Sequence, residues 1–196
     1  IEPELSAQKI DNLVFIPDAG LRSLPIAALY DGQYFLVEKY SLGLMPSFSL
    51  TDIRYRDIKK AAFLAMGASQ FVEQEALPAV PAELAAISKT RPGHIFLNEA
   101  FTLDNLKSQR NQQSFSILHL ATHSKFNPGQ RANSYIQLWD TKLRLDQLSQ
   151  LRWNDPPVDL LVLSACRTAL GSEEAELGFA GLAFKAGVRS ALGSLW

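Results

Sequence analysis

Two residues that can do nucleophilic chemistry follow apolar runs of the sequence. Cys166, the only cysteine of the 196-residue chain, comes two positions after the run of residues 159–164, and His123 closes the run of residues 114–122. An imidazole beside a thiol can take the thiol proton, hold the thiolate as an ion pair and later protonate a leaving amine. The pair therefore predicts attack on a carbonyl carbon, a chemistry that needs no metal.

Both apolar runs read as strands buried on two faces. Residues 158–163 and 114–122 carry branched apolar side chains without the alternation of a half-buried strand. The C-terminal ends of parallel strands share one edge of a sheet, which is where open α/β sheets place their chemistry. If the two strands are neighbours, His123 and Cys166 meet at this edge. The backbone N–H groups of Ser124 and Cys166 are then placed to bind an oxyanion.

The rest of the chain alternates predicted strands and helices. Further strands or extended pieces are predicted at residues 12–17, 34–38, 40–44, 61–67, 94–97, 135–139 and 190–196. Helices are predicted at residues 24–29, 46–60, 82–91, 102–110, 145–151 and 177–186, with Thr102 as an N-cap. This order predicts an α/β sandwich with a mostly parallel sheet.

Composition narrows the setting of the chain. Hydrophobic residues make up 47% of it and the net charge is −1, so we expect a sizeable core and neither a nucleic-acid nor an anionic-membrane partner. No apolar run approaches the length of a membrane span, and residues 1–4 lack the pattern of a signal peptide. A single cysteine excludes an internal disulfide and predicts a cytoplasmic protein. The missing initial Met and the strand that stops at Trp196 predict a fragment of a longer protein.

Two motifs resemble the CHAT domain, a bacterial branch of the caspase-like cysteine peptidases. They are His119-Leu-Ala-Thr-His123 and Leu163-Ser-Ala-Cys166-Arg-Thr-Ala-Leu-Gly171, and the separation of 43 residues between His123 and Cys166 is close to that in caspases. Supporting segments cover nearly the whole chain: residues 24–29, 34–38, 46–47 and 178–183.

The resemblance implies a fold and a site. The fold is the caspase-like three-layer sandwich in a single domain over residues 1–196, with a last strand and helix of the family outside this chain. His123 is the base, Cys166 the nucleophile, and a peptide or protein the substrate. A helical repeat array commonly precedes such domains and predicts a regulatory partner within the parent protein. One departure is Ser124, which stands where these families usually have glycine; its Cβ lies where a substrate approaches, and we expect it to lower activity.

Several residues have competing interpretations. Candidates for substrate binding are Asp159, Ser164, Glu173 and Trp196. The two acidic residues could bind a basic side chain of the substrate. Ser164 stands two positions before the cysteine, and Trp196 could form a wall of the cleft. His119, between two leucines, is interpreted as a hydrogen-bonded core residue, and His94 as a structural or edge residue. A metal site at His119 and His123 is disfavoured because no further cysteine or acidic cluster completes it.

Three functions remain open from the sequence. The leading one is a cysteine endopeptidase without cofactor; no Gly-x-Gly-x-x-Gly or Walker pattern predicts a nucleotide. The second is a weakly active or inactive module that acts in regulation or protein–protein interaction. The third, a hydrolase with Ser124 or Ser164 as nucleophile, lacks a Gly-x-Ser-x-Gly elbow.

Overall fold

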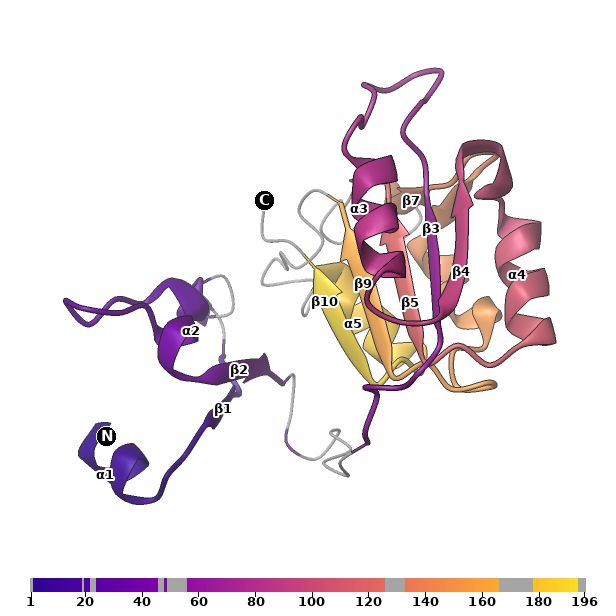
Figure 1. Cartoon of the computed structure of the whole chain (residues 1–196). Helices are drawn as coiled ribbons and strands as arrows, with labels where there is room; N and C mark the ends of the chain where they lie inside the picture. Colours follow the sequence, from indigo (N-terminus) through magenta and orange to yellow (C-terminus); the bar gives the residue numbers. More distant parts are fainter. Residues whose placement is uncertain are drawn as a thin grey trace. The chain divides into compact units, whose positions relative to one another are not determined.

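A computed structural model describes residues 2–18, 20–21, 24–45, 48, 56–125, 133–165 and 178–193. The chain divides into two compact units, Ile1–Ile53 and Arg54–Trp196, which we describe separately. Figure 1 labels their elements. No helix in these described ranges combines the length and the apolar character needed to cross a bilayer. Most of the helix predicted at residues 46–60 lies outside them.

The first unit is built around a pair of parallel strands. Its elements are α1 (Glu2–Ala7), β1 (Asn12–Phe15), the 3₁₀ helix η2 (Ile26–Ala28), α2 (Leu36–Lys39) and β2 (Ser41–Leu44). Strand β1 pairs with β2 in parallel. The two strands and η2 confirm the predicted segments at residues 12–17, 40–44 and 24–29, whereas α1 was not predicted.

The extended piece predicted at residues 34–38 is wrong, because polar groups close a turn there. The Asp31 carboxylate accepts hydrogen bonds from the backbone N–H groups of Gln33 and Tyr34, both at 2.8 Å. The Glu38 carboxylate then accepts from the N–H of Phe35 at 2.6 Å and caps α2. Lys39 bonds to Asp31 at 2.6 Å and holds the pKa of that carboxyl well below its ordinary value.

The second unit contains a five-stranded parallel sheet, in the order β10-β9-β5-β3-β4. Its strands are β3 (Phe63–Gly67), β4 (Gly93–Leu97), β5 (Ile117–Ala121), β9 (Leu160–Ser164) and β10 (Ser190–Gly193). All five lie where the sequence predicted strands. The parallel sheet follows from the long crossovers between these strands, most of which contain a helix.

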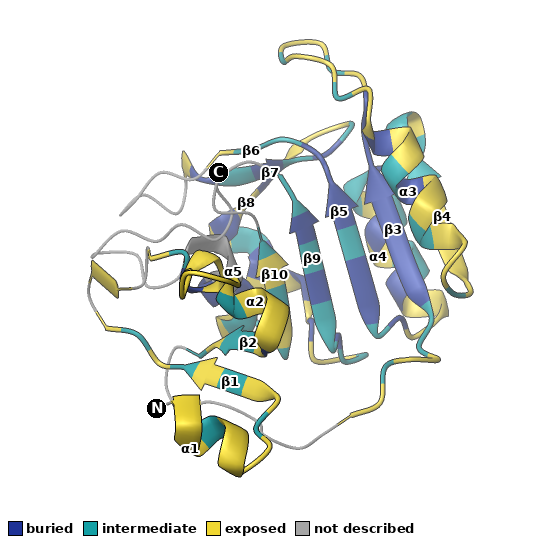
Figure 2. Cartoon of the chain, turned by 60° about the vertical axis from the view of Figure 1, so that its left-hand side comes forward, coloured by how far each residue is buried: buried dark blue, intermediate teal, exposed yellow. Residues whose placement is uncertain are grey.

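Helices cover both faces of this sheet, so the predicted α/β sandwich is confirmed. Helix α3 (Val80–Ser88) packs on the face formed by Phe63, Ala65, Ile117 and Ala121. The other face carries α4 (Leu103–Gln112), the 3₁₀ helix η6 (Leu145–Leu151) and α5 (Gly178–Lys185). A short 3₁₀ helix, η4 (Asn98–Ala100), precedes α4, and Thr102 caps α4 by accepting from the N–H of Asn105. The central strands are the most deeply buried part of the unit (Figure 2).

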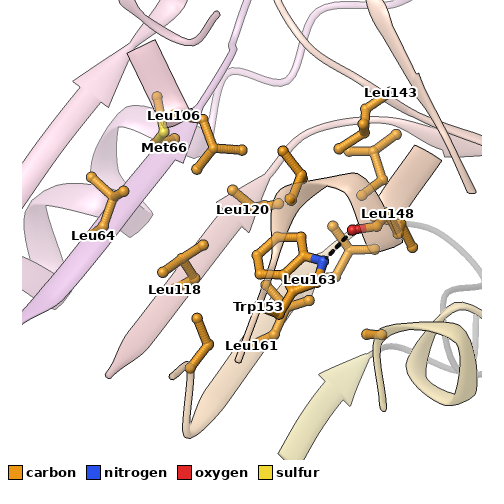
Figure 3. Packing of buried hydrophobic residues seen from close by; sticks show 14 of the residues in the cluster. Leu64, Met66, Leu106, Leu118, Leu120, Leu143, Leu148, Trp153, Leu161 and Leu163 are labelled. Carbon is orange, nitrogen blue, oxygen red and sulfur yellow. Dashed lines mark hydrogen bonds between the residues drawn. The ribbon is translucent and has the colours of Figure 1, made fainter. Parts of the chain in front are cut away.

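Trp153 fills the larger core, under β5 and β9 (Figure 3). Its side chain is completely buried, and its indole Nε1–H donates to the carbonyl of Leu148 at 2.7 Å. The Arg110 guanidinium lies 5.0 Å from the indole ring and donates to the carbonyls of Leu151, Arg152 and Pro156. Burial lowers the pKa of Arg110, and these carbonyls accept hydrogen bonds from three of its five N–H donors. Trp153 thus joins η6 to the sheet.

A small antiparallel sheet follows β5 directly. It consists of β6 (Ser124–Lys125), β7 (Tyr135–Gln137) and β8 (Lys142–Arg144), in that order. Strand β7 was predicted, but β6 and β8 were not. Ile136 and Leu143 are buried in the main core, so one face of this small sheet packs against the unit.

Gly67, the last residue of β3, allows a close approach to β5. A Cβ added there would lie 2.6 Å from the carbonyl oxygen of Ala121 and 2.8 Å from Cγ1 of Val80. We expect Gly67→Ala to lower the free energy of unfolding by about 1–3 kcal/mol, because backbone and helix must move apart. Urea unfolding followed by circular dichroism measures this. Gly43→Ala is the matched control, since its Cβ would meet only Val14 at 3.8 Å. Equal loss in both variants would contradict the prediction.

Candidate active site

His123 lies two residues after the end of β5, at the C-terminal edge of the parallel sheet. Its Nε2 is 2.8 Å from the carbonyl oxygen of Glu75, and its ring packs against Phe71 with centroids 4.7 Å apart. A carbonyl only accepts hydrogen bonds, so Nε2 carries the proton in this contact. In the neutral ring Nδ1 is then unprotonated and is the nitrogen that can accept a proton.

The register of β5 and β9 bears on the second residue of the predicted pair. These strands are neighbours, and Ala121 is the register partner of Ser164. The N–H of Thr122 continues the ladder by donating to the carbonyl of Ser164 at 3.1 Å. His123 stands two positions after Ala121 in the sequence, and Cys166 stands two positions after Ser164. Cys166 itself lies outside the described residues.

Side-chain parity adds to this register. Ala121 belongs to the face of the sheet that α3 covers, and its register partner Ser164 shares that face. Successive side chains along a strand alternate between faces, so a position two residues further returns to the same side. This face is the one from which the chain continues to His123, two positions after Ala121.

Ser124, the residue after the histidine, begins β6. The N–H of Gln137 donates to the carbonyl of His123 at 2.9 Å, so residues 123 and 137 form a hydrogen-bonded pair of the antiparallel ladder. Backbone groups alternate in direction along such a ladder, which turns the N–H of Ser124 away from β7.

The loop between β3 and α3 supplies the groups that hold His123. It contributes the ring of Phe71 and the carbonyl of Glu75. The loop is tied down by Asn98, whose Oδ1 accepts from both the N–H and the Oγ of Ser69. Neither Phe71 nor Glu75 was predicted as a site residue. A backbone carbonyl leaves no mark in the residue type, so only the aromatic ring gave any signal in the sequence.

The other predicted site residues are not all brought to this edge. Ser164 ends β9 at the same edge as His123. Asp159 instead precedes β9 at the opposite end of the strand, where its carboxylate pairs with Arg189 at 2.7 Å. This ion pair gives Asp159 a structural partner, and we leave it out of the site. Glu173 and Trp196 lie outside the described residues.

The remaining histidines have partners away from the candidate pair. His119 Nε2 is 2.7 Å from a carboxylate oxygen of Glu83 on α3, and its side chain is 12% exposed, which confirms a hydrogen-bonded, mostly buried histidine. His94 lies on edge strand β4, and its Nδ1 is 3.1 Å from Oε1 of Gln109. Within the described part of the chain, no three His, Cys, Asp or Glu side chains gather as a metal would require.

Comparison with models of protein families identifies the family to which the chain belongs. The family model described as "CHAT domain" matches residues 1–196, the whole chain. The comparison with curated proteins finds no match.

Proposed function

The chain belongs to the CHAT domain family, which is related to the caspase-like cysteine peptidases, and we propose that it is a cysteine endopeptidase with a Cys166–His123 dyad. The observation that carries the proposal is the register of β5 and β9. Ala121 and Ser164 are partners at the ends of adjacent parallel strands, and each proposed catalytic residue follows its partner by two positions.

In the proposed mechanism, His123 Nδ1 takes the proton of the Cys166 thiol. The thiolate attacks the carbonyl carbon of the scissile peptide bond, and the backbone N–H groups of Ser124 and Cys166 bind the resulting oxyanion. Collapse of this intermediate breaks the C–N bond, and His123 gives its proton to the leaving amine. Water, deprotonated by His123, then attacks the acyl-enzyme and releases the carboxylic acid with the free thiol.

The surroundings of His123 support its role as the base. The bond from Nε2 to the Glu75 carbonyl leaves Nδ1 as the nitrogen that accepts the thiol proton. The Phe71 ring restricts rotation of the imidazole. Both contacts hold the general base in one orientation. An oriented base accelerates proton transfer more than a freely rotating side chain does.

A second candidate function is a regulatory or interaction module with little peptidase activity. Ser124 favours it, because its Cβ adds bulk beside the proposed oxyanion site. We also propose that the parent protein carries a helical repeat array and lies in the cytoplasm. Both properties are compatible with either function.

Labelling of the thiol distinguishes the two functions. We expect peptidyl acyloxymethyl ketones, tested as a panel that varies the residue before the bond, to label Cys166 in the folded chain. His123→Ala should slow the labelling at least tenfold, since the thiolate loses its base. Because Cys166 is the only cysteine, intact-mass spectrometry reads the product without ambiguity.

The control is the same chain unfolded in urea. Labelling of the folded chain that is no faster than that of the unfolded chain, for every peptide of the panel, would contradict the endopeptidase and favour the module.

A further inference from the structure

The outward face of the small antiparallel sheet carries three cations. Lys125, Tyr135 and Arg144 are successive register partners across β6, β7 and β8, so they form one row on one face. Lys142 and Gln137 form the next row of the same face, because they lie two residues from Arg144 and Tyr135. The opposite face holds the buried Ile136 and Leu143, which fixes the cationic row toward solvent.

This face borders a pocket of about 690 Å³. Lys125, Lys142, Arg144 and Tyr135 line it, and Asn133, Thr141 and Gln147 add amide and hydroxyl groups. None of the described residues that line it is acidic. A chain with a net charge of −1 does not gather three cations around one hollow through general basicity, so the cluster predicts an anionic ligand.

The cations are only loosely neutralised within the described chain. Lys142 is 3.8 Å from Glu73 and Arg144 is 3.7 Å from Asp146, and all four side chains are at least 45% exposed. Exposed ion pairs of this length contribute little and exchange readily. The Lys142 ammonium also lies 5.0 Å from the centre of the Tyr135 ring, which holds it over the face.

A second cavity lies beside this face and shares Lys142 with the first pocket. It measures about 380 Å³; Phe71, Val72 and Trp139 supply its apolar lining, and its polar lining is Gln70, Glu73, Gln74, Gln137 and Lys142. Lys142 also lines the cationic pocket, and Phe71 packs against His123. The Oε1 atom of Gln74 is buried and accepts no hydrogen bond from the described residues, so it can receive an N–H from a ligand.

We propose that the cationic face binds an acidic segment of the peptide substrate. This inference rests on the proposed function, because it assigns the substrate of the same site. An apolar side chain of the peptide enters the cavity between Phe71 and Trp139, and carboxylates that follow it reach Lys142, Lys125 and Arg144. Lys125 and Arg144 stand on strands separated by β7, about 10 Å apart. Carboxylates two positions apart on an extended peptide point to the same side at a spacing of about 7 Å, and the long Lys and Arg side chains can converge on them.

The apolar cavity is what favours a peptide over a nucleic acid. The phosphate backbone of a duplex is bound by cations alone, whereas a peptide also uses the cavity lined by Phe71 and Trp139 and the buried acceptor of Gln74.

Binding is tested with the 196-residue chain carrying Cys166→Ala, so that no cleavage occurs. Fluorescence anisotropy measures the binding of labelled peptides in which a leucine precedes six glutamates, six glutamines or six lysines. We expect the glutamate peptide to bind best, and its Kd to rise as salt increases from about 50 to about 300 mM. The triple variant Lys125→Gln/Lys142→Gln/Arg144→Gln should weaken its binding about tenfold.

The matched control is Lys60→Gln/Lys89→Gln/Lys107→Gln, which removes three exposed cations elsewhere on the unit. It should leave the Kd unchanged. Equal weakening in both triple variants would overturn the proposal, and so would a six-nucleotide single strand that binds as tightly as the glutamate peptide. Circular dichroism checks the fold of each variant, and if the triple variant unfolds, Lys125→Gln alone should still weaken binding measurably.

The outcomes separate this inference from the proposed function. If Cys166 is labelled by peptide ketones and the glutamate peptide does not bind, the inference is wrong while the dyad stands. If the glutamate peptide binds and Cys166 is not labelled, the cationic face stands as a peptide-binding surface while the endopeptidase falls.

Discussion

We expect peptide hydrolysis to fall to the uncatalysed background when Cys166 is replaced by alanine, and by about 10²–10⁴-fold when His123 is replaced by alanine. The first variant removes the atom that forms the acyl-enzyme. The second leaves the thiol without a base and leaves the departing amine without a proton donor. We expect these effects in kcat/KM with any peptide that labels Cys166 efficiently as its ketone derivative.

His94→Ala is the matched control for this experiment. His94 lies on edge strand β4, where its partner is Gln109 of helix α4 and its ring lies 5.3 Å from that of Phe115. Its loss should leave kcat/KM within about twofold of the wild type. Hydrolysis that survives Cys166→Ala would rule the mechanism out, and an equal loss in His94→Ala and His123→Ala would assign the His123 effect to folding.

Replacing Trp153 with alanine should lower the free energy of unfolding by about 3–5 kcal/mol. The side chain is among the largest that are fully buried, and its removal opens a cavity under β5 and β9. It also leaves the Arg110 guanidinium without the ring on which it stacks. Urea unfolding measured by far-UV circular dichroism reports this loss without depending on tryptophan fluorescence.

Two further variants test the reason for that loss. Trp153→Phe keeps much of the apolar volume but removes the hydrogen bond to Leu148, so it should cost less than Trp153→Ala. Val72→Ala changes a fully exposed side chain and should have almost no effect on unfolding. A loss in Trp153→Ala no larger than that in Val72→Ala would contradict the core position of the indole.

The elements that position the site could be predicted because burial on two faces leaves a clear pattern. The sequence runs that form β5 and β9 show no alternation of apolar and polar residues. Such a run is typical of a strand inside a parallel sheet, where both faces are buried. The neighbouring positions of β5 and β9 were a condition in the sequence argument, and the observed strand order confirms it.

The rest of the surroundings could not be predicted for two physical reasons. Strands β6 and β8 contain two and three residues, too few for a periodic pattern, and they are held by pairing with β7. The Glu75 carbonyl that bonds to His123 is a backbone group, which every residue type provides. The ion pair of Asp159 with Arg189 likewise depends on β9 and β10 being neighbours, a fact of topology.

The strand order also sets a time at which the proposed peptidase can first act. Strands β3, β4 and β5 can pair as soon as residue 121 has left the ribosome, but β9, which pairs with the other edge of β5, is made later. Until then one edge of β5 stays open, as an edge strand that chaperones or other chains can bind. Until then a nascent chain carries the proposed base without its nucleophile, and it cannot cut neighbouring polypeptides before residue 166 has been made.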